Sequence, residues 1–130
     1  MPKVKMEGAD ELRRALRKAG KIAPIALASA MVVEQEKVMA VAKTRTPVDL
    51  GPLRASGTVL PPEIAGTRIT VASGFGGAAK DYALVQHEDL TLNHSVGGPK
   101  FLEGPFNERI RLMPRMLAKG VESALKRLGK

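Results

Sequence analysis

The chain has 130 residues, the size of one ordinary domain with a single core. Only 3% of them are aromatic, so we expect a core of aliphatic side chains and methionine, and the lack of cysteine excludes disulfides and thiolate zinc sites and fits an intracellular protein. The net charge of +8 is uneven, with +5 over residues 1–45, −2 over 46–104 and +5 over 105–130. Such basic ends fit either solvated helix faces or contacts with a polyanion or an acidic partner.

The longest apolar run covers residues 22–33 and is too short to cross a bilayer, which takes about 20 apolar residues. The acidic residues that precede it are not typical of a secretory leader, whose start is short and basic. We therefore expect no membrane partner.

Two amphipathic helices are predicted at the N-terminus, over residues 7–20 and 25–44. Asp10 is expected to cap the first helix, and Gly20 to end it in a left-handed conformation. Pro24 fits either the first turn of the second helix or a kink within one long helix. The second helix has one face made of the following residues: Ala28, Met31, Val32, Gln35, Val38, Met39 and Ala42.

The segment TPVDLGPLRASG, residues 46–57, should stop this helix and turn the chain. Pro47 disfavours helical backbone at the residue before it, so the helix should end near Arg45. Asp49 suits an Asx-turn and Gly51 suits a positive φ. A strand is predicted over residues 54–60.

A strand is predicted over residues 67–74, because apolar and polar residues alternate there. Residues 81–89 are predicted to form a third strand, or a strand that enters a short turn. Residues 91–100 are predicted to be a loop from their composition. An apolar stripe over residues 106–128 predicts a terminal helix, which Pro114 should kink or break.

This order of elements predicts an α+β domain. N-terminal amphipathic helices and a C-terminal helix would pack on a small antiparallel meander of about three or four strands. The single domain, residues 1–130, would be helical over 1–45, β-rich with loops over 46–104, and helical again over 105–130.

One cluster raises the question of catalysis or metal binding, namely His87, Glu88 and Asp89 with His94. Successive residues of a strand point to opposite faces, so His87 and Glu88 would not share a metal ion. The chain also has no HExxH, phosphate-loop or Ser-His-Asp pattern. We predict that the protein is not an enzyme and uses no cofactor.

Sequence-specific nucleic-acid recognition is not expected either. The predicted sheet has a single tyrosine on which a base could stack. A helix-turn-helix over residues 10–44 would begin its second helix with IAPIALASA, in which no side chain reads a base edge.

Three motifs follow one another after a basic amphipathic N-terminal helix. The first, P-v-x-x-G-x-L-R-x-S, is formed by Pro47, Val48, Gly51, Leu53, Arg54 and Ser56. The second resembles a Y-A-x-x-x-E strand and is formed by Tyr82, Ala83 and Glu88, with four residues rather than three between Ala83 and Glu88. The segment from Gln86 to Asp89 stands in place of the more common glutamate followed by glycine. The third, K-F-L-x-x-P-F, is formed by Lys100, Phe101, Leu102, Pro105 and Phe106. In their order and spacing they resemble the tail-component or neck family of long-tailed bacteriophages.

The resemblance implies structural work in the virion. Such proteins form rings, sixfold or twelvefold, at the neck or upper tail, where they meet connector and tail-tube or terminator proteins and complete the head–tail junction. They lie in the host cytoplasm before assembly, and basic helix faces would be free to touch DNA phosphates without reading bases. The alternative is a small basic protein that binds nucleic acid without sequence specificity.

Within this picture two regions are candidates for subunit contacts. Arg54, predicted at the start of a strand, would pair with Asp81 or Glu88, or else contact a partner subunit. The predicted loop 89–100 exceeds the usual length of a connection and is expected to lie across a neighbour. Its anchors would be Leu90, Leu92, Asn93 and His94.

Overall fold

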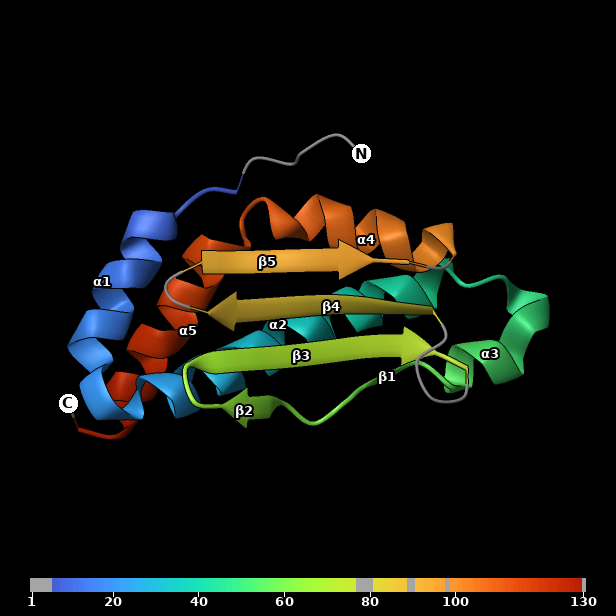
Figure 1. The fold of residues 1–130 in the computed structure, drawn as a ribbon. Coiled ribbons are helices and arrows are strands. Elements are labelled where there is room, and N and C mark those ends of the chain that lie inside the picture. The colour runs from blue at the N-terminus through green and yellow to red at the C-terminus, as the bar shows by residue number, and fades with distance from the viewer. Residues whose placement is uncertain (1–5, 77–80, 89–90, 98, 130) are drawn as a thin grey trace.

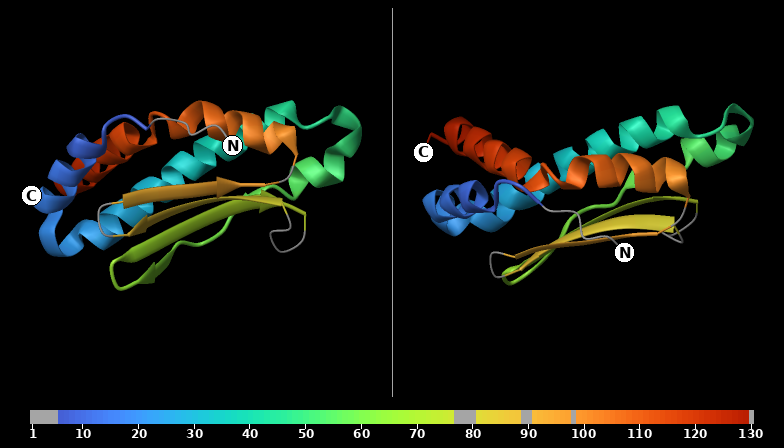
Figure 2. Two further views of the ribbon diagram at one scale, coloured as in Figure 1. Left: turned by 45° about the horizontal axis from the view of Figure 1, so that its top comes forward. Right: turned by 90° about the horizontal axis from the view of Figure 1, so that it is seen from above.

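The computed structural model describes residues 6–76, 81–88, 91–97 and 99–129, with only the backbone described at residues 81 and 82. Helices cover one face of an antiparallel sheet and leave the other face open (Figures 1 and 2). The predicted α+β class and antiparallel meander are confirmed, with five strands among the described residues.

Two N-terminal helices form as expected. The first is α1 (Ala9–Ala19), and the second is α2 (Ala23–Arg45), which follows a 3-10 turn, η1 (Gly20–Ile22), and carries Pro24 in its first turn. Gly20 ends α1 with a positive φ of 59°. Asp10 is not the cap, because Gly8 occupies that position and Asp10 instead pairs with Arg13 at 2.8 Å.

The segment after α2 differs from its prediction. Helix α2 ends at Arg45 as expected, but a second 3-10 turn, η2 (Val48–Leu50), and a short helix, α3 (Gly51–Ala55), follow it. Pro52 suits the first turn of a helix, and Gly51 has a helical φ of −51° rather than a positive one. The predicted strand 54–60 is therefore reduced to β1 (Thr58–Val59).

The sheet has the order β1-β3-β4-β5, and β2 (Glu63–Ala65) pairs with the other end of β3 (Arg68–Phe75). The break between β1 and β2 falls at Pro61 and Pro62, which have no N–H to donate to the ladder. Strand β4 (Asp81–Glu88) pairs Val85 with Val71 of β3.

Residues predicted as a loop form an edge strand. Strand β5 (Thr91–Val96) pairs with β4 over its whole length, from Glu88↔Thr91 to Ala83↔Val96. The loop prediction is wrong, because the segment alternates residues directed toward the helices, such as Leu92, with polar residues directed outward, such as Asn93. Because polar residues dominate the segment, its alternation of inward and outward residues was not recognised from the sequence.

The C-terminal part contains two helices, α4 (Lys100–Ile110) and α5 (Met113–Arg127). Helix α4 begins before the predicted boundary, so Pro105 lies inside it, whereas Pro114 lies in the first turn of α5, after the expected break. Helix α4 lies over the sheet next to α2, and α5 packs chiefly against α1 and α2 (Figure 2).

The core forms where α2 crosses the sheet. It contains Met31, Val38, Val71 and Phe75 from this contact, and Phe106 and Leu117 from the C-terminal helices, all of them almost completely buried. The chain comes very close to α2 at Gly57, where an added Cβ would lie 2.7 Å from both Met39 Sδ and a ring carbon of Phe75.

Candidate interaction surfaces

The motif residues build one end of the molecule. Ser56 Oγ donates to the carbonyl of Leu53 at 2.6 Å and accepts from the N–H of Gly76 at 2.8 Å, so it ties α3 to the end of β3. Next to it, the Phe101 ring meets Phe75 edge-on with centroids 5.1 Å apart.

Most of the remaining motif residues support this same end, but Glu88 lies at the opposite end of β4, next to Arg68 at the start of β3. Tyr82 pairs with Gly74 in the sheet. Ala83, Leu102, Pro105 and Phe106 are buried, and Leu53 packs partly against the core, whereas Pro47 and Gly51 are exposed. One residue of each motif, namely Ser56, Tyr82 and Phe101, therefore lies at the end of β3, and the motif residues there form turns and core contacts.

Arg54 braces the segment that precedes it. Its Nη2 donates to the carbonyl oxygen of Thr46 at 2.9 Å, across the turn that leads from α2 to α3. The predicted pair with Glu88 is wrong, because Glu88 pairs with Arg68 at 2.9 Å, and the side chain of Asp81 lies outside the described part of the chain. The contact between Arg54 and a partner subunit stays a prediction.

The four anchors that were assigned to the loop have different surroundings. Leu92 is only 8% exposed and belongs to the core, and Leu90 lies outside the described residues. Half-buried His94 lies with its ring centroid 5.8 Å from that of Phe106, and this burial lowers the pKa of the imidazole. Asn93 is exposed on the open face of the sheet.

The histidine and acidic cluster separates as strand geometry requires. His87 is buried, whereas Glu88 on the opposite face is partly exposed and bonded to Arg68, which confirms that the two point apart. Asp89 lies outside the described residues. Within the part of the chain that the structure describes, no three side chains are arranged to hold a metal ion, and no helix is long and apolar enough to cross a membrane.

Two buried polar contacts position α2, and the sequence pattern did not reveal them. Gln35 donates from Nε2 to the carbonyl of Val71 at 3.3 Å and accepts at Oε1 from the Ser73 hydroxyl at 2.9 Å. Glu34, which is not part of the predicted apolar face of this helix, is buried and accepts from Arg109 Nε at 2.7 Å. These bonds fix the position of α2 on the sheet and on α4, because any shift would leave buried polar groups without partners.

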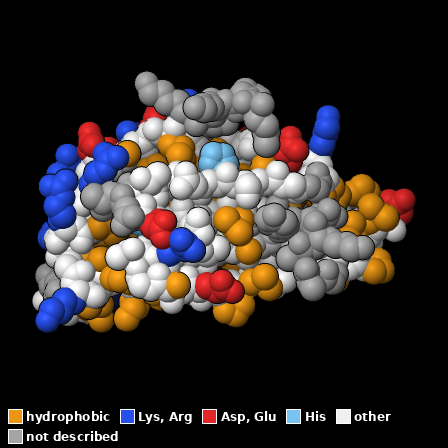
Figure 3. Space-filling view, in the orientation of Figure 1, with side chains coloured by type: hydrophobic (Ala, Val, Ile, Leu, Met, Phe, Trp, Pro, Cys, Tyr) orange, Lys and Arg blue, Asp and Glu red, His pale blue; other side chains and the backbone are white. Residues whose placement is uncertain are grey.

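Lysine and arginine side chains gather where α1 and α5 pack together (Figure 3). The two helices are linked by Lys18–Glu122 and Arg115–Glu11, each at 3.3 Å. Six exposed cations there have no carboxylate within ion-pair distance among the described residues, namely Arg14, Arg17, Lys21, Lys119, Lys126 and Arg127. We call these six side chains the cationic cluster.

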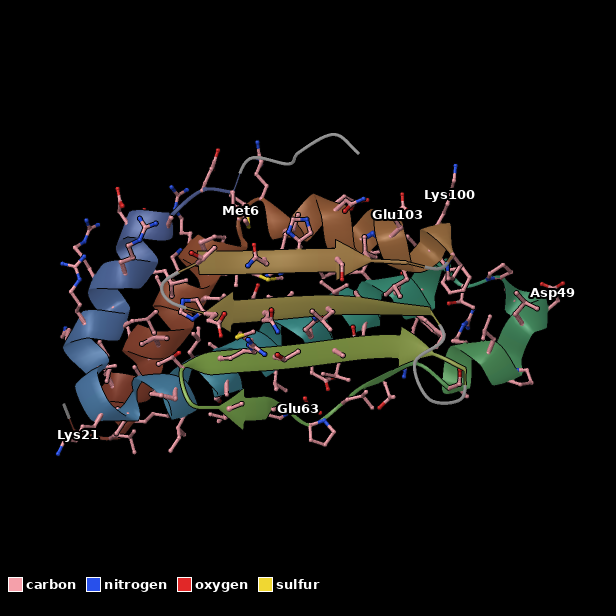
Figure 4. The ribbon with its side chains drawn as sticks, viewed as in Figure 1. Met6, Lys21, Asp49, Glu63, Lys100 and Glu103 are labelled. Carbon is pink, nitrogen blue, oxygen red and sulfur yellow. The ribbon has the colours of Figure 1, made fainter. Side chains whose placement is uncertain are left out.

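The opposite end of the molecule exposes apolar side chains. Val48 in η2 is 85% exposed and Leu50 is 40% exposed, next to the acidic side chain of Asp49 (Figures 3 and 4). A separate apolar cavity of about 370 Å³ opens between the α1–α2 corner and the ends of β3 and β4.

Comparison with known proteins adds no relative: no protein-family model, curated sequence or solved structure matches this chain at a significant level. The resemblance to phage neck proteins therefore stays a prediction from the three sequence motifs.

Proposed function

We propose that the protein is a structural subunit of the neck or upper tail of a long-tailed bacteriophage, where it assembles as a ring that joins head and tail. The observation that carries the proposal is that one residue of each motif lies at the end of β3, where Ser56 bonds Gly76, Tyr82 pairs with Gly74 and Phe101 packs on Phe75. Residues from the three motifs thus share one packing region of the fold. Their packing therefore supports the likeness to a family of assembly proteins.

In this role the protein works by shape and contact rather than by catalysis. Its partners would be further copies of itself, in sixfold or twelvefold rings, and the connector and tail-tube or terminator proteins on either side. A ring of identical subunits needs a heterologous interface, in which two different patches of each copy meet. The exposed apolar residues at the α3 end supply one patch of the required kind.

The proposal is tested in a phage that carries this gene. A nonsense codon early in the gene should leave DNA-filled heads and free tails that accumulate separately, as seen by electron microscopy. Purified protein added to the extract should restore joined, infectious particles, whereas buffer should not. Normal numbers of joined particles without the protein would overturn the proposal.

The cationic cluster on α1 and α5 favours a second candidate, a small basic protein that binds nucleic acid without sequence specificity. Its six cations would contact phosphates, so the affinity should fall steeply with salt and be equal for unrelated duplexes. Reversal of Lys119 and Lys126 to glutamate should then abolish binding. This candidate replaces the first if the nonsense phage joins heads to tails normally and the purified chain binds DNA as a monomer.

A further inference from the structure

The α3 end of the molecule presents a rigid apolar knob, which we define as residues 47–53. Its apolar side chains, Val48 and Leu50, point away from the core, although burial of such side chains is what normally stabilises a fold. Exposed aliphatic residues are common singly, but here two lie within three positions at the outermost point of the fold. Asp49 lies between them in the sequence, and Figure 4 shows it at this tip.

The knob is held in shape by bonds of its own. Leu50 N–H donates to the carbonyl of Pro47 at 2.9 Å, and Arg54 donates to the carbonyl of Thr46. Ser56 ties the following turn to the end of β3. The side chains are therefore presented by an ordered backbone, which lowers the entropy lost on binding.

The far end of the molecule contains a hole of matching chemistry, the cavity of about 370 Å³. Its apolar walls come from Leu16 of α1, from Ala23 and Leu27 of α2 and from Ile69 of β3. The corner is open at Gly20, where an added Cβ would have no atom within 4 Å. An aliphatic cavity of about 150 Å³ already accepts benzene, so this one has room for two aliphatic side chains.

Knob and hole also match in charge. Asp49 lies on the knob, whereas Arg17 lines the hole and exposed Lys21 directly follows Gly20, which also lines it. Figure 4 places Asp49 and Lys21 at opposite ends of the molecule, so the two patches cannot meet within one copy. Opposite charges that flank an apolar contact favour one register of docking over others.

We infer that the knob of one copy docks into the hole of the next, with Val48 and Leu50 in the cavity and Asp49 beside Arg17 and Lys21. The contact is heterologous, so its repetition closes a ring when the rotation between copies fits and extends a filament when it does not. The inference rests on the proposed function and names the interface through which that ring would form.

Disulfide trapping tests this contact directly, because the chain has no cysteine of its own. The Asp49→Cys chain is mixed with the Lys21→Cys chain under mild oxidation, and dimers are followed on non-reducing gels. The control replaces Lys21→Cys with Ser29→Cys, another exposed site that does not line the hole. The Lys21 pair should be trapped at least tenfold faster than the control pair, and the double variant with both cysteines should form a ladder of multimers.

The apolar part of the contact is tested by adding Val48→Asp to the Asp49→Cys chain. This change should slow trapping at least tenfold, whereas Val33→Asp on the exposed side of α2 should leave the rate unchanged. Equal rates for the two cysteine pairs, or no effect of Val48→Asp, would overturn the inference.

The outcome is independent of the test of the neck role. If the protein is needed for head–tail joining but the Lys21→Cys and Asp49→Cys pair is not trapped, the proposed function stands and this interface is rejected. Efficient trapping in a protein whose loss leaves head–tail joining intact would keep the interface and reject the proposed function.

Discussion

Leu117 and Val48 are both aliphatic, yet the structure treats them in opposite ways. Leu117 of α5 is completely buried among helices, whereas Val48 at the tip is 85% exposed. The core places its aliphatic side chains where folding alone removes them from water. At the tip, hydrogen bonds to the backbone hold the chain and its aliphatic side chains stay outside. The contrast shows that the core stabilises the fold, whereas the exposed tip is free for the association proposed above.

The largest expected effect comes from a charge placed in the core. Leu117→Asp buries a carboxylate without a partner and should lower the free energy of unfolding by about 3 kcal/mol or more. Chemical denaturation followed by circular dichroism measures the loss. An unchanged midpoint would mean that α5 does not pack as described, and the contrast with the tip would disappear.

A smaller loss is expected from the polar bridge between α2 and β3. Gln35→Leu leaves the Ser73 hydroxyl and the Val71 carbonyl without this partner, and Ser73→Ala leaves the Gln35 amide oxygen unpaired. Each change should lower the unfolding free energy by about 1–3 kcal/mol.

The double variant Gln35→Leu/Ser73→Ala separates the bridge from its parts. Its loss of unfolding free energy should be clearly smaller than the sum of the losses in the two single variants, because each single change already breaks the Gln35–Ser73 bond. Additive losses in a double-mutant cycle would show that the two side chains do not act together.

His94 lies at the border of the core and makes stability depend on pH. Burial disfavours the charged ring, so the pKa of His94 in the folded state lies below its ordinary value of 6.5. The unfolded chain therefore binds more protons between these two pKa values, and stability should fall as the pH drops from about 6.5 toward the folded-state pKa.

Urea titrations at several pH values, with the His94→Gln variant beside the unaltered chain, measure this contribution. The variant should have a flatter pH dependence below 6.5. The same slope in both proteins would mean that the environment of His94 does not change on folding.

The smallest effect on stability is expected at the tip. Val48→Asp puts a charge on a side chain that is already in water, so the free energy of unfolding should stay within about 0.5 kcal/mol of the unaltered value. Denaturation of this variant next to Leu117→Asp gives the sharpest form of the comparison. A loss at Val48 similar to that at Leu117 would show that the tip is part of the core.

Much of the fold follows from local sequence. Periodic apolar residues predict α1, α2 and α5, and alternation predicts β3, because each of these elements buries one clear face. The edge strand β5 was not predicted. Its outward residues are polar and its inward face includes His94, so its composition suggested a loop. Helix α3 was not predicted, because glycine and proline, as at Gly51 and Pro52, are typical of turns as well as of helix starts.

The surfaces were harder to predict than the fold. Val48 is present in the quoted motif, but only the tertiary structure shows that it is exposed at a tip. The residues that line the cavity are far apart in the sequence, from Leu16 to His87, so no local sequence pattern indicates it. The loop anchors were misplaced for a related reason, since Leu92 is fixed by its pairing with His87 in the neighbouring strand.

One trapping measurement tests most directly the claim that two different ends of the chain meet. One protein carries a filled hole and an intact knob, as Ala23→Leu/Asp49→Cys, and the other a damaged knob and an intact hole, as Val48→Asp/Lys21→Cys. The mixture retains one functional contact, so the account predicts disulfide heterodimers of two 13.9-kDa chains that grow no further. When the two cysteines are exchanged between the proteins, they lie on the damaged knob and beside the filled hole, whereas the intact knob and hole carry none. Trapping should then fall to background. Equal trapping in both arrangements, or none in either, would contradict the account.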